Sequence, residues 1–258
     1  MAARRRLDAE LVRRGLATTR TEAQAAVAAG RVTVAGAPAT VTRPADKPAR
    51  LVAPGEPVRV LGDGPRFVGR GGDKLDAALT QFGLDPTGMR VLDAGASTGG
   101  FTDCLLQRGA AEVVAVDVGH GQLHARLRSD PRVRVHERVN VRHLKPEAIG
   151  GTVDAAVADL SFISLRAVLG PLTEAVAPGG WLVLLVKPQF EAGRAEVSRG
   201  RGVIRDPAVH DRVRQEIDDS LRAHGSIIMG WMESPLRGAD GNVEYLVAAR
   251  RPTSEAGA

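Results

Sequence analysis

Four charged side chains stand at the ends of apolar segments in this sequence of 258 residues: Asp93, Asp117, Asp159 and Lys187. The segments are near-continuous apolar runs, which is typical of parallel strands that helices cover on both faces. Because the ligands of open α/β sheets lie beyond the carboxyl ends of the strands, we expect these side chains to face one crevice. An uncharged lysine there could remove a proton from a substrate, with the carboxylates holding cationic groups.

The loop after Asp93 is the most specific indication of a ligand-binding site in the sequence. It runs from a strand into a helix, and its glycines would let the backbone approach a ligand while the amides of the new helix offer partial positive charge. The spacing differs from the Gly-x-Gly-x-x-Gly of dinucleotide-binding proteins, and a carboxylate here suits an ammonium or sulfonium rather than a pyrophosphate. We therefore predict that S-adenosylmethionine is bound by Asp93, Gly95, Ala96, Ser97, Thr98, Gly99, Gly100 and Phe101. A tight turn between strand and helix would account for the same glycines.

Further residues are predicted to complete the cofactor site. Asp117 ends the second strand, where such folds bind ribose hydroxyls, although aspartate also caps turns. Asn140 follows the third strand, where it could border an adenine or form a turn. Val118, beside Asp117, and Asp159, at the end of the fourth strand, are assigned to the same site.

The elements that must position these residues follow from the hydrophobic pattern. Apolar runs predict strands at residues 89–94, 113–117, 133–136, 153–158, 181–186, 226–233 and 243–249. Helices are expected at residues 75–82, 101–108 and 207–223. Because no helix joins the last two strands, the predicted fold is a Rossmann-like α/β methyltransferase sheet of seven strands, the seventh antiparallel.

The amino-terminal region is rich in arginine. Residues 4–14 are expected to form a basic helix, Thr19 and Glu22 have the spacing of a capping box for a second helix, and residues 31–34 resemble a strand. This pattern resembles the small α+β RNA-binding module of the ribosomal-protein-S4 type. Predicted RNA contacts are Arg4, Arg6, Arg14, Arg20 and Arg31, with Arg70 from the larger domain. A basic, solvated helix pair without a ligand would show the same pattern.

Prolines recur between residues 37 and 65 and allow only short extended pieces. We therefore predict an RNA-binding domain at residues 1–61, a linker at residues 62–68 and a catalytic domain at residues 69–258. At the start of the larger domain, glycines precede Lys74 and a helix from Leu75, where a cation opposes the helix dipole. This placement of Lys74 suggests a function, and a solvated lysine is the alternative.

Composition excludes several classes of protein. No apolar run approaches the roughly 20 residues that span a bilayer, so we expect a cytoplasmic protein without a membrane partner. The single cysteine, Cys104, excludes an internal disulfide and a cysteine-cluster metal site, and no metal is expected. A net charge of +5 makes a polyanion a reasonable partner, and a monomer is favoured.

Several motifs together resemble one family, the TlyA ribosomal RNA 2′-O-methyltransferases, also called hemolysin A, with an FtsJ-like catalytic domain. They lie at residues 92–102, 117–123, 159–165, 187–191 and 241–245. The resemblance implies a catalytic tetrad of Lys74, Asp159, Lys187 and Glu244. It also implies cytidine methylation in 16S or 23S ribosomal RNA, free or in assembled subunits. Gly69 and Phe67 depart from the family pattern, which usually has serine at the first position and in some members tryptophan at the second.

A ribose hydroxyl is a poor nucleophile at neutral pH, so methyl transfer to it requires a positioned base. Burial, a second lysine and a nearby sulfonium would favour an uncharged Lys187, which we assign as that base. Asp159 and Glu244 would hold the two amines in place and partly counter this effect. Two rival functions are a non-catalytic RNA-binding ribosome factor and a membrane-active hemolysin. The complete tetrad argues against the first, and aromatic residues at only 3% of the chain argue against the second.

Overall fold

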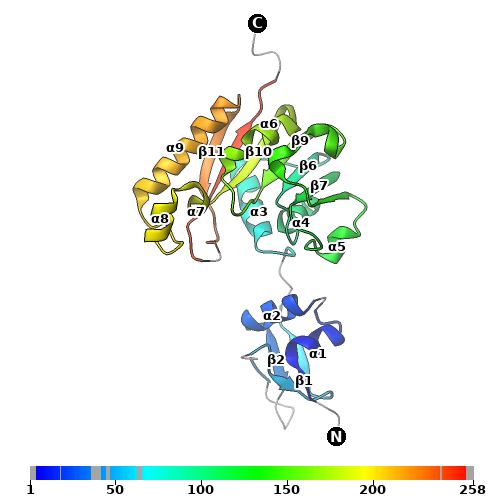
Figure 1. Ribbon diagram of the computed structural model, residues 1–258. Coiled ribbons are helices and arrows are strands. Elements are labelled where there is room, and N and C mark those ends of the chain that lie inside the picture. The colour runs from blue at the N-terminus through cyan, green and yellow to red at the C-terminus, as the bar shows by residue number, and fades with distance from the viewer. Residues whose placement is uncertain are drawn as a thin grey trace. The chain divides into compact units, whose positions relative to one another are not determined.

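The computed structural model describes residues 4–17, 19–35, 42–44, 47–62, 66–238 and 240–253. The chain divides into two compact units, Met1–Pro65 and Arg66–Ala258 (Figure 1). The division falls within the linker predicted at residues 62–68, of which residues 63–65 lie outside the described residues. Phe67 and Val68 belong to the larger unit, because the Phe67 ring is buried in its core and the Val68 amide donates to Asp103 Oδ2 at 2.9 Å.

The smaller unit packs two helices against short antiparallel strands. Strand β2 pairs with β3 on one side and β5 on the other, and β1 pairs with β4. Its elements are β1 (Arg5–Arg6), α1 (Leu7–Arg13), α2 (Arg20–Ala28), β2 (Val32–Ala35), β3 (Thr42–Pro44), β4 (Leu51–Val52) and β5 (Val58–Val60). The Thr19 side chain accepts a hydrogen bond from the Glu22 amide at 3.1 Å, so α2 begins where the capping pattern predicts.

The first helix begins later than predicted. Arg5 and Arg6 are extended, because their backbone pairs with Val52 and Leu51, and α1 begins at Leu7. Leu7 and Leu11 are fully buried in the core of this unit, as their helical spacing predicts. The expectation of a helix over residues 4–14 is therefore wrong for residues 4–6, where strand pairing replaces the first helical turn.

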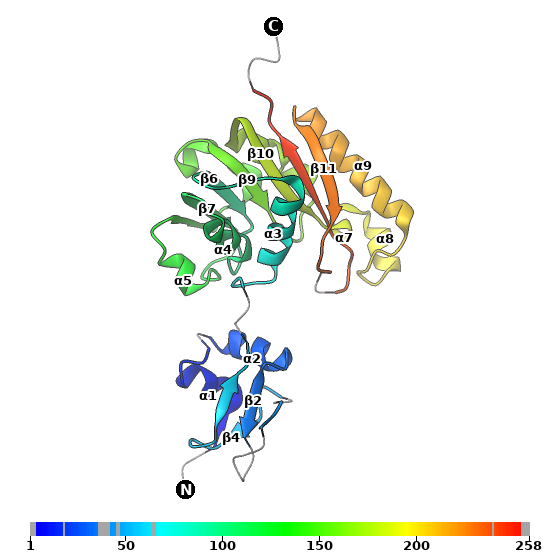
Figure 2. The ribbon, with the colours of Figure 1, turned by 180° about the vertical axis from the view of Figure 1, so that it is seen from behind.

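The larger unit is built on a seven-stranded sheet with the order β11-β12-β10-β9-β6-β7-β8 (Figures 1 and 2). Its strands are β6 (Arg90–Ala94), β7 (Glu112–Asp117), β8 (Val133–Glu137), β9 (Val153–Ala158), β10 (Val176–Val186), β11 (Ile227–Glu233) and β12 (Tyr245–Arg250). Strands β6 to β10 are parallel, and β12 lies antiparallel between β10 and β11. The predicted methyltransferase-type sheet, including its antiparallel seventh strand, is confirmed.

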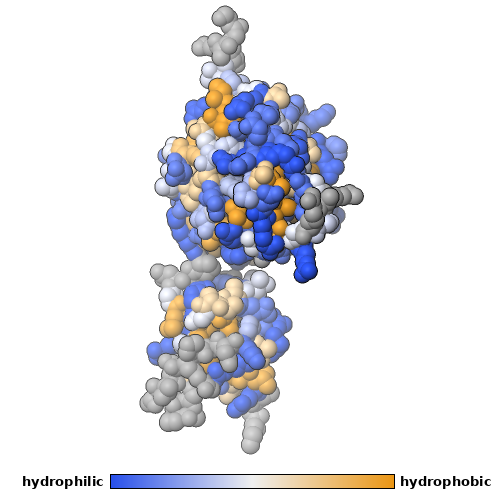
Figure 3. Space-filling model, turned by 90° about the vertical axis from the view of Figure 1, so that its left-hand side faces the viewer, coloured by the Kyte–Doolittle hydropathy of each residue, from blue (hydrophilic) through white to orange (hydrophobic). Residues whose placement is uncertain are grey.

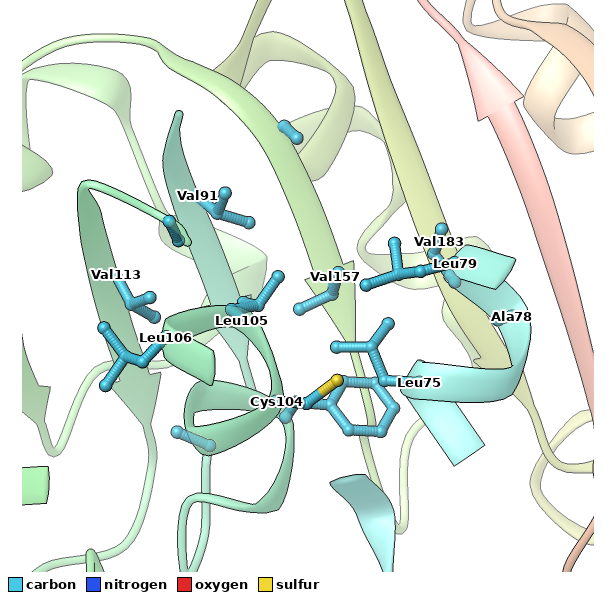
Figure 4. Close-up of a cluster of buried hydrophobic side chains, with 14 of the residues drawn as sticks. Leu75, Ala78, Leu79, Val91, Cys104, Leu105, Leu106, Val113, Val157 and Val183 are labelled. Carbon is cyan, nitrogen blue, oxygen red and sulfur yellow. The ribbon is translucent and has the colours of Figure 1, made fainter. Parts of the chain in front are cut away.

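Helices cover both faces of this sheet. They are α3 (Gly71–Phe82), α4 (Gly100–Gln107), α5 (Ala125–Arg128), α6 (Leu169–Ala175), α7 (Pro188–Glu191), α8 (Arg194–Arg199) and α9 (Pro207–Ala223), with 3₁₀ turns η1 (Val141–His143), η2 (Pro146–Ile149) and η3 (Leu165–Ala167). Alternate strand residues enter two separate cores: Val91 faces α3 and α4, whereas Leu92 faces α6 and α9. Figure 4 shows part of the first core, where labelled side chains of the two helices and four strands meet: Leu75, Ala78, Leu79, Cys104, Leu105, Leu106, Val91, Val113, Val157 and Val183.

Helix α9 is amphipathic. Val213, Ile217 and Leu221 are buried against the sheet, and the face of the larger unit that α9 covers is mostly hydrophilic (Figure 3). This helix agrees with the prediction for residues 207–223. It covers one face of the sheet, and loops rather than this helix surround the carboxyl ends of the parallel strands.

Two element starts in the larger unit differ from expectation by four or five residues, whereas the other boundaries differ by two residues or fewer. Helix α3 begins at Gly71, so Gly71 and Gly72 are helical. A Cβ atom at Gly72 would lie 2.3 Å from the Phe67 side chain, and close packing explains this glycine. Strand β10 begins at Val176, because the turn predicted at residues 178–180 is an irregularity within the strand rather than its boundary.

Candidate active site

The loop between β6 and α4 is shaped by glycines that no other residue could replace without strain. Gly95 and Gly99 have φ angles of +85° and +99°. A Cβ atom at Gly95 would lie 2.6 Å from the Asp159 carbonyl oxygen, and one at Gly99 would lie 2.2 Å from Leu127. The loop is therefore pressed against the end of β9, and its backbone is exposed to a ligand.

Asp93 lies in β6 just before this loop and is completely buried. Thr102 Oγ1 donates to Asp93 Oδ2 at 2.6 Å, whereas Asp93 Oδ1 is buried without a hydrogen-bond partner among the described residues. Burial raises the pKa of the Asp93 carboxyl to about 7. A buried carboxylate oxygen with no donor is suited to a cationic group, which would favour the ionised form.

This raised pKa predicts a characteristic pH dependence of stability. The unfolded carboxyl titrates near its ordinary value of 3.8, so the contribution of Asp93 to folding stability is greatest below that pH and is lost as the pH rises toward 7. Because each pKa unit is worth about 1.4 kcal/mol, the loss is on the order of 4 kcal/mol at most. Differential scanning calorimetry of the ligand-free protein and of Asp93→Asn would measure it. We expect a smaller decline in the variant, and equal declines would contradict the prediction.

A hollow of about 210 Å³ opens beside the loop. Its lining comes from the start of α3, the β6–α4 loop and the ends of β9 and β10: Gly69, Arg70, Gly71, Gly95, Ala96, Ser97, Thr98, Gly100, Phe101, Asp159, Ser161 and Lys187. The structure thus brings together most of the predicted loop residues with Asp159, Lys187 and Arg70. Asp93 lies behind this lining and not in it.

Asp117 lines a second, much smaller hollow on the other side of Ala96 and Ser97, which contribute to both. Its two carboxylate oxygens accept from the amides of Ser97, at 2.8 Å, and Gly119, at 2.6 Å. Each oxygen keeps a second lone pair for a further donor. The carboxylate thus stabilises a turn and remains able to accept from a ligand hydroxyl.

Four predicted cofactor residues lie outside both hollows: Asp93, Gly99, Val118 and Asn140. Val118 is 73% exposed, and Asn140 caps the 3₁₀ turn η1 by accepting from the Arg142 amide at 3.1 Å. The structure thus shows the turn that was one interpretation of Asn140, and its contact with an adenine stays a prediction.

Lys187 lies at the end of β10 with its side chain only 10% exposed. Its Nζ atom is 2.6 Å from Asp159 Oδ1 and donates to Ser161 Oγ at 2.9 Å. Both partners come from the segment that follows β9 and line the hollow. The amine is thus held at the hollow by two acceptors.

A second buried ion pair joins Lys74 of α3 to Glu244, which precedes β12, at 2.5 Å. A Cβ atom at Gly238 would lie 2.6 Å from Glu244 Oε1, so this glycine makes room for the carboxylate. Gly71, three residues before Lys74 and on the same face of α3, approaches Asp159 so closely that a Cβ atom would lie 3.6 Å from Oδ2. The helix turns one face toward both ion pairs.

Comparison with known proteins identifies this arrangement. A family model described as FtsJ-like methyltransferase matches residues 67–251, and an S4 domain model matches residues 5–58. The Mycobacterium tuberculosis protein named 16S/23S rRNA (cytidine-2′-O)-methyltransferase TlyA is 49% identical over 99% of this chain and 93% of its own length. The chain belongs to the TlyA family of FtsJ-like methyltransferases.

Two further relatives carry a different name. Hemolysin A of Brachyspira hyodysenteriae is 36% identical over 93% of this chain and 98% of its own. The solved structure of a candidate hemolysin from Streptococcus thermophilus is 38% identical, covers 99% of this chain and 92% of its own, and superimposes with a TM-score of 0.74. Among the described residues, no helix is long and apolar enough to cross a membrane.

The S4 unit of this TlyA protein uses several of the predicted RNA-contacting arginines internally. Asp8, fully buried, accepts from Arg6 Nε and Nη2 at 3.1 and 2.9 Å and from Arg20 at 3.2 Å, and the Arg6 guanidinium holds the pKa of this carboxyl well below its usual range. Both arginines remain about half exposed. Arg4 is exposed, and Arg31 is partly buried.

Arg14 was predicted to face solvent or phosphate, and this prediction is wrong. Its guanidinium donates to Glu10 at 2.8 Å and to the carbonyl oxygens of Glu56 and Pro54 at 2.8 and 2.9 Å. The side chain is 20% exposed and fixes the turn between β4 and β5. Sequence could not reveal this role, because the acceptors are backbone groups about 40 residues away.

Three site residues were missed at the level of sequence: Ser161, Phe162 and Glu191. Phe162 is 90% exposed with φ at +63°, and its ring lies 5.1 Å from that of Phe190. Glu191 is buried, which raises its pKa, and it accepts from the Leu165 amide at 2.8 Å and Ser164 Oγ at 2.5 Å. All lie within motifs that the sequence singles out, but their roles depend on which side chains meet.

In the described part of the chain, no group of His, Cys, Asp or Glu side chains could hold a metal ion.

Proposed function

We propose that this protein transfers a methyl group from S-adenosylmethionine to the 2′-hydroxyl of a cytidine in 16S or 23S ribosomal RNA. The observation that carries the proposal is the Lys187–Asp159 ion pair at a hollow bounded by the glycine loop of a methyltransferase sheet. The name of the 49% identical M. tuberculosis relative supports the same substrate.

The residues around the hollow fit the cofactor. The backbone at Gly95 and Gly99 leaves no room for side chains, and the Asp159 carboxylate on the lining suits a cationic ligand. S-adenosylmethionine supplies a methyl group on a positively charged sulfur, which an oxygen nucleophile can displace. We assign the β6–α4 loop and Asp117 to hold it, with Asp117 accepting from the ribose.

The chain's own residues then perform the acid–base chemistry. The Lys187 ammonium first releases a proton to solvent, and the uncharged amine then accepts the proton of the ribose hydroxyl, so that an O–H bond breaks as an N–H bond forms at Nζ. Asp159 holds this amine and stabilises its charged form after the transfer. The Lys74–Glu244 pair fixes α3 against the end of the sheet and supplies a second amine to the region.

Substrate binding is assigned to two surfaces. Half-exposed Arg6 and Arg20 of the S4 unit, with exposed Arg4, present guanidinium groups to phosphates. In the larger unit, the exposed ring of Phe162, which follows the lining residue Ser161 in sequence, is a surface on which a base displaced from its stack can rest. Such displacement costs a few kcal/mol, which these contacts would offset.

Asp117→Ala is expected to weaken S-adenosylmethionine binding by ~1.5–3 kcal/mol, because it removes a hydrogen bond to a charged acceptor. Isothermal titration calorimetry measures this directly. Glu147→Ala provides a matched carboxylate on an exposed 3₁₀ turn, and it should leave affinity unchanged. Wild-type affinity for Asp117→Ala would remove this residue from the proposed site.

Mass mapping of ribose methylation tests the function as a whole. Small and large ribosomal subunits, and the RNA extracted from each, are incubated with purified protein and S-adenosylmethionine. We expect 2′-O-methylcytidine at discrete positions, and comparison of the samples shows whether assembled subunits are required. Methylation on a base, or no methylation of any sample, would overturn the proposed function.

A further inference from the structure

The surroundings of Lys187 Nζ hold one polar group that the tetrad does not include. Ser161 Oγ lies 2.9 Å from Nζ, on the lining of the same hollow as Asp159 and Lys187. An uncharged lysine amine has two N–H donors and one lone pair arranged around the nitrogen. Asp159 Oδ1, at 2.6 Å, and Ser161 Oγ are two acceptors, one for each N–H. When both bonds form, the lone pair has one remaining direction.

We propose that Ser161 is a positioning residue that, together with Asp159, directs the lone pair of Lys187 into the hollow. The inference rests on the proposed function, in which Lys187 is the base. During the reaction the O–H bond of the ribose hydroxyl breaks and an N–H bond forms at Nζ, while the Ser161 hydroxyl keeps its own proton. Without Ser161, the amine can rotate about its Cε–Nζ bond, and the lone pair spends less time aimed at the substrate.

The structure fixes Ser161 in this position from both sides. At its start, the segment from Asp159 to Leu165 meets Lys187 through the ion pair. At its end, Glu191 accepts from the Leu165 amide and from Ser164 Oγ. Lys187 and Glu191 are four residues apart on the segment after β10, so this segment holds the Ser161 loop at two points. A hydroxyl carried by such a loop can define a direction, which a freely moving one cannot.

Contacts next to Ser161 add to this constraint. The Phe162 ring packs on Phe190 at 5.1 Å, and its backbone adopts the unusual φ of +63°. The Asp159 carbonyl oxygen touches the glycine loop so closely that Gly95 cannot carry a Cβ atom. The strained conformation at Phe162 persists because the neighbouring contacts hold it, and strain of this kind concentrates at active sites.

Single-turnover methylation of ribosomal subunits, measured over a range of subunit concentrations, tests the inference. Ser161→Ala removes the acceptor, and Ser161→Thr keeps it. Ser129→Ala is a matched control at the carboxyl end of α5, where the Ser129 Oγ donates to the Ala125 carbonyl. We expect Ser161→Ala to lower the maximal rate ~10- to 100-fold, with half-saturating subunit concentration, cofactor affinity and melting temperature near wild type. Ser161→Thr should recover most of the rate, and Ser129→Ala all of it.

The possible results distinguish a failure of the inference from a failure of the proposed function on which it rests. A wild-type maximal rate for Ser161→Ala overturns the inference alone. A raised half-saturating concentration with an unchanged maximal rate also overturns it, because Ser161 would then bind substrate rather than position the base. Failure of Ser161→Thr to recover the rate would show that a hydroxyl is not what is required. An inactive wild-type protein overturns the proposed function and the inference together.

Discussion

Lys187→Arg is expected to lower the single-turnover rate of ribose methylation about 100- to 10,000-fold while leaving cofactor and RNA binding near wild type. Arginine keeps the positive charge and can still pair with Asp159, but a guanidinium does not lose its proton at workable pH. The substitution therefore removes proton transfer and keeps electrostatics. Lys187→Ala, which removes both, should be at least as slow.

The matched control is Lys145→Arg, because Lys145 is an exposed lysine far from the hollow in sequence and absent from its lining. It should methylate at the wild-type rate. Single-turnover kinetics separates the chemical step from substrate binding, and calorimetry with S-adenosylmethionine checks the cofactor site. Wild-type rates for Lys187→Arg would mean that Lys187 is an electrostatic clamp, and the base would then be sought at Lys74.

Glu244→Gln should destabilise the folded protein by about 3–5 kcal/mol, because it leaves the buried Lys74 ammonium without its counter-charge. The two side chains are only 3% and 10% exposed, so water cannot compensate. The double variant Lys74→Met with Glu244→Leu removes both charges and should recover most of this stability. It should remain inactive, since the tetrad is gone.

Chemical denaturation followed by circular dichroism measures these differences. Glu233→Gln is the surface control: its pair with Arg237, at 3.9 Å, is more than half exposed and should contribute no more than about 1 kcal/mol. If Glu244→Gln were as stable as this control, the Lys74–Glu244 pair would not be the buried interaction described above. If the double variant kept its activity, the two residues would have no part in catalysis.

Much of the larger unit could be predicted from sequence because its signals are local. The apolar runs ending in Asp93, Asp117, Asp159 and Lys187 each reveal a strand and the edge at which it ends, without knowledge of any distant residue. The glycine loop is similarly local, since its backbone angles are a property of the glycines themselves. These features placed the hollow at the correct edge of the sheet.

Pairings between distant residues could not be predicted from periodicity. Lys74 and Glu244 are 170 residues apart, and only the family resemblance suggested that they belong together. Likewise, Arg14 has the composition of a phosphate-binding residue, but tertiary contacts with backbone carbonyls decide its role. The same charged side chain can bind a ligand or stabilise a turn, and the choice depends on which acceptors the fold brings near.

The position of β12 has a consequence for how the protein acquires activity during its synthesis. Among the described strands this one comes last in sequence, yet it inserts between β10 and β11 rather than adding to an edge. Glu244 directly precedes it, so until this segment has been synthesised Lys74 lacks its buried partner, and β11 lacks its only neighbour in the described sheet. Domains generally fold from the amino terminus as they emerge from the ribosome. The S4 unit can therefore fold while the larger unit is still inactive, and we expect methylation competence only after β12 has been synthesised and has paired with β10 and β11.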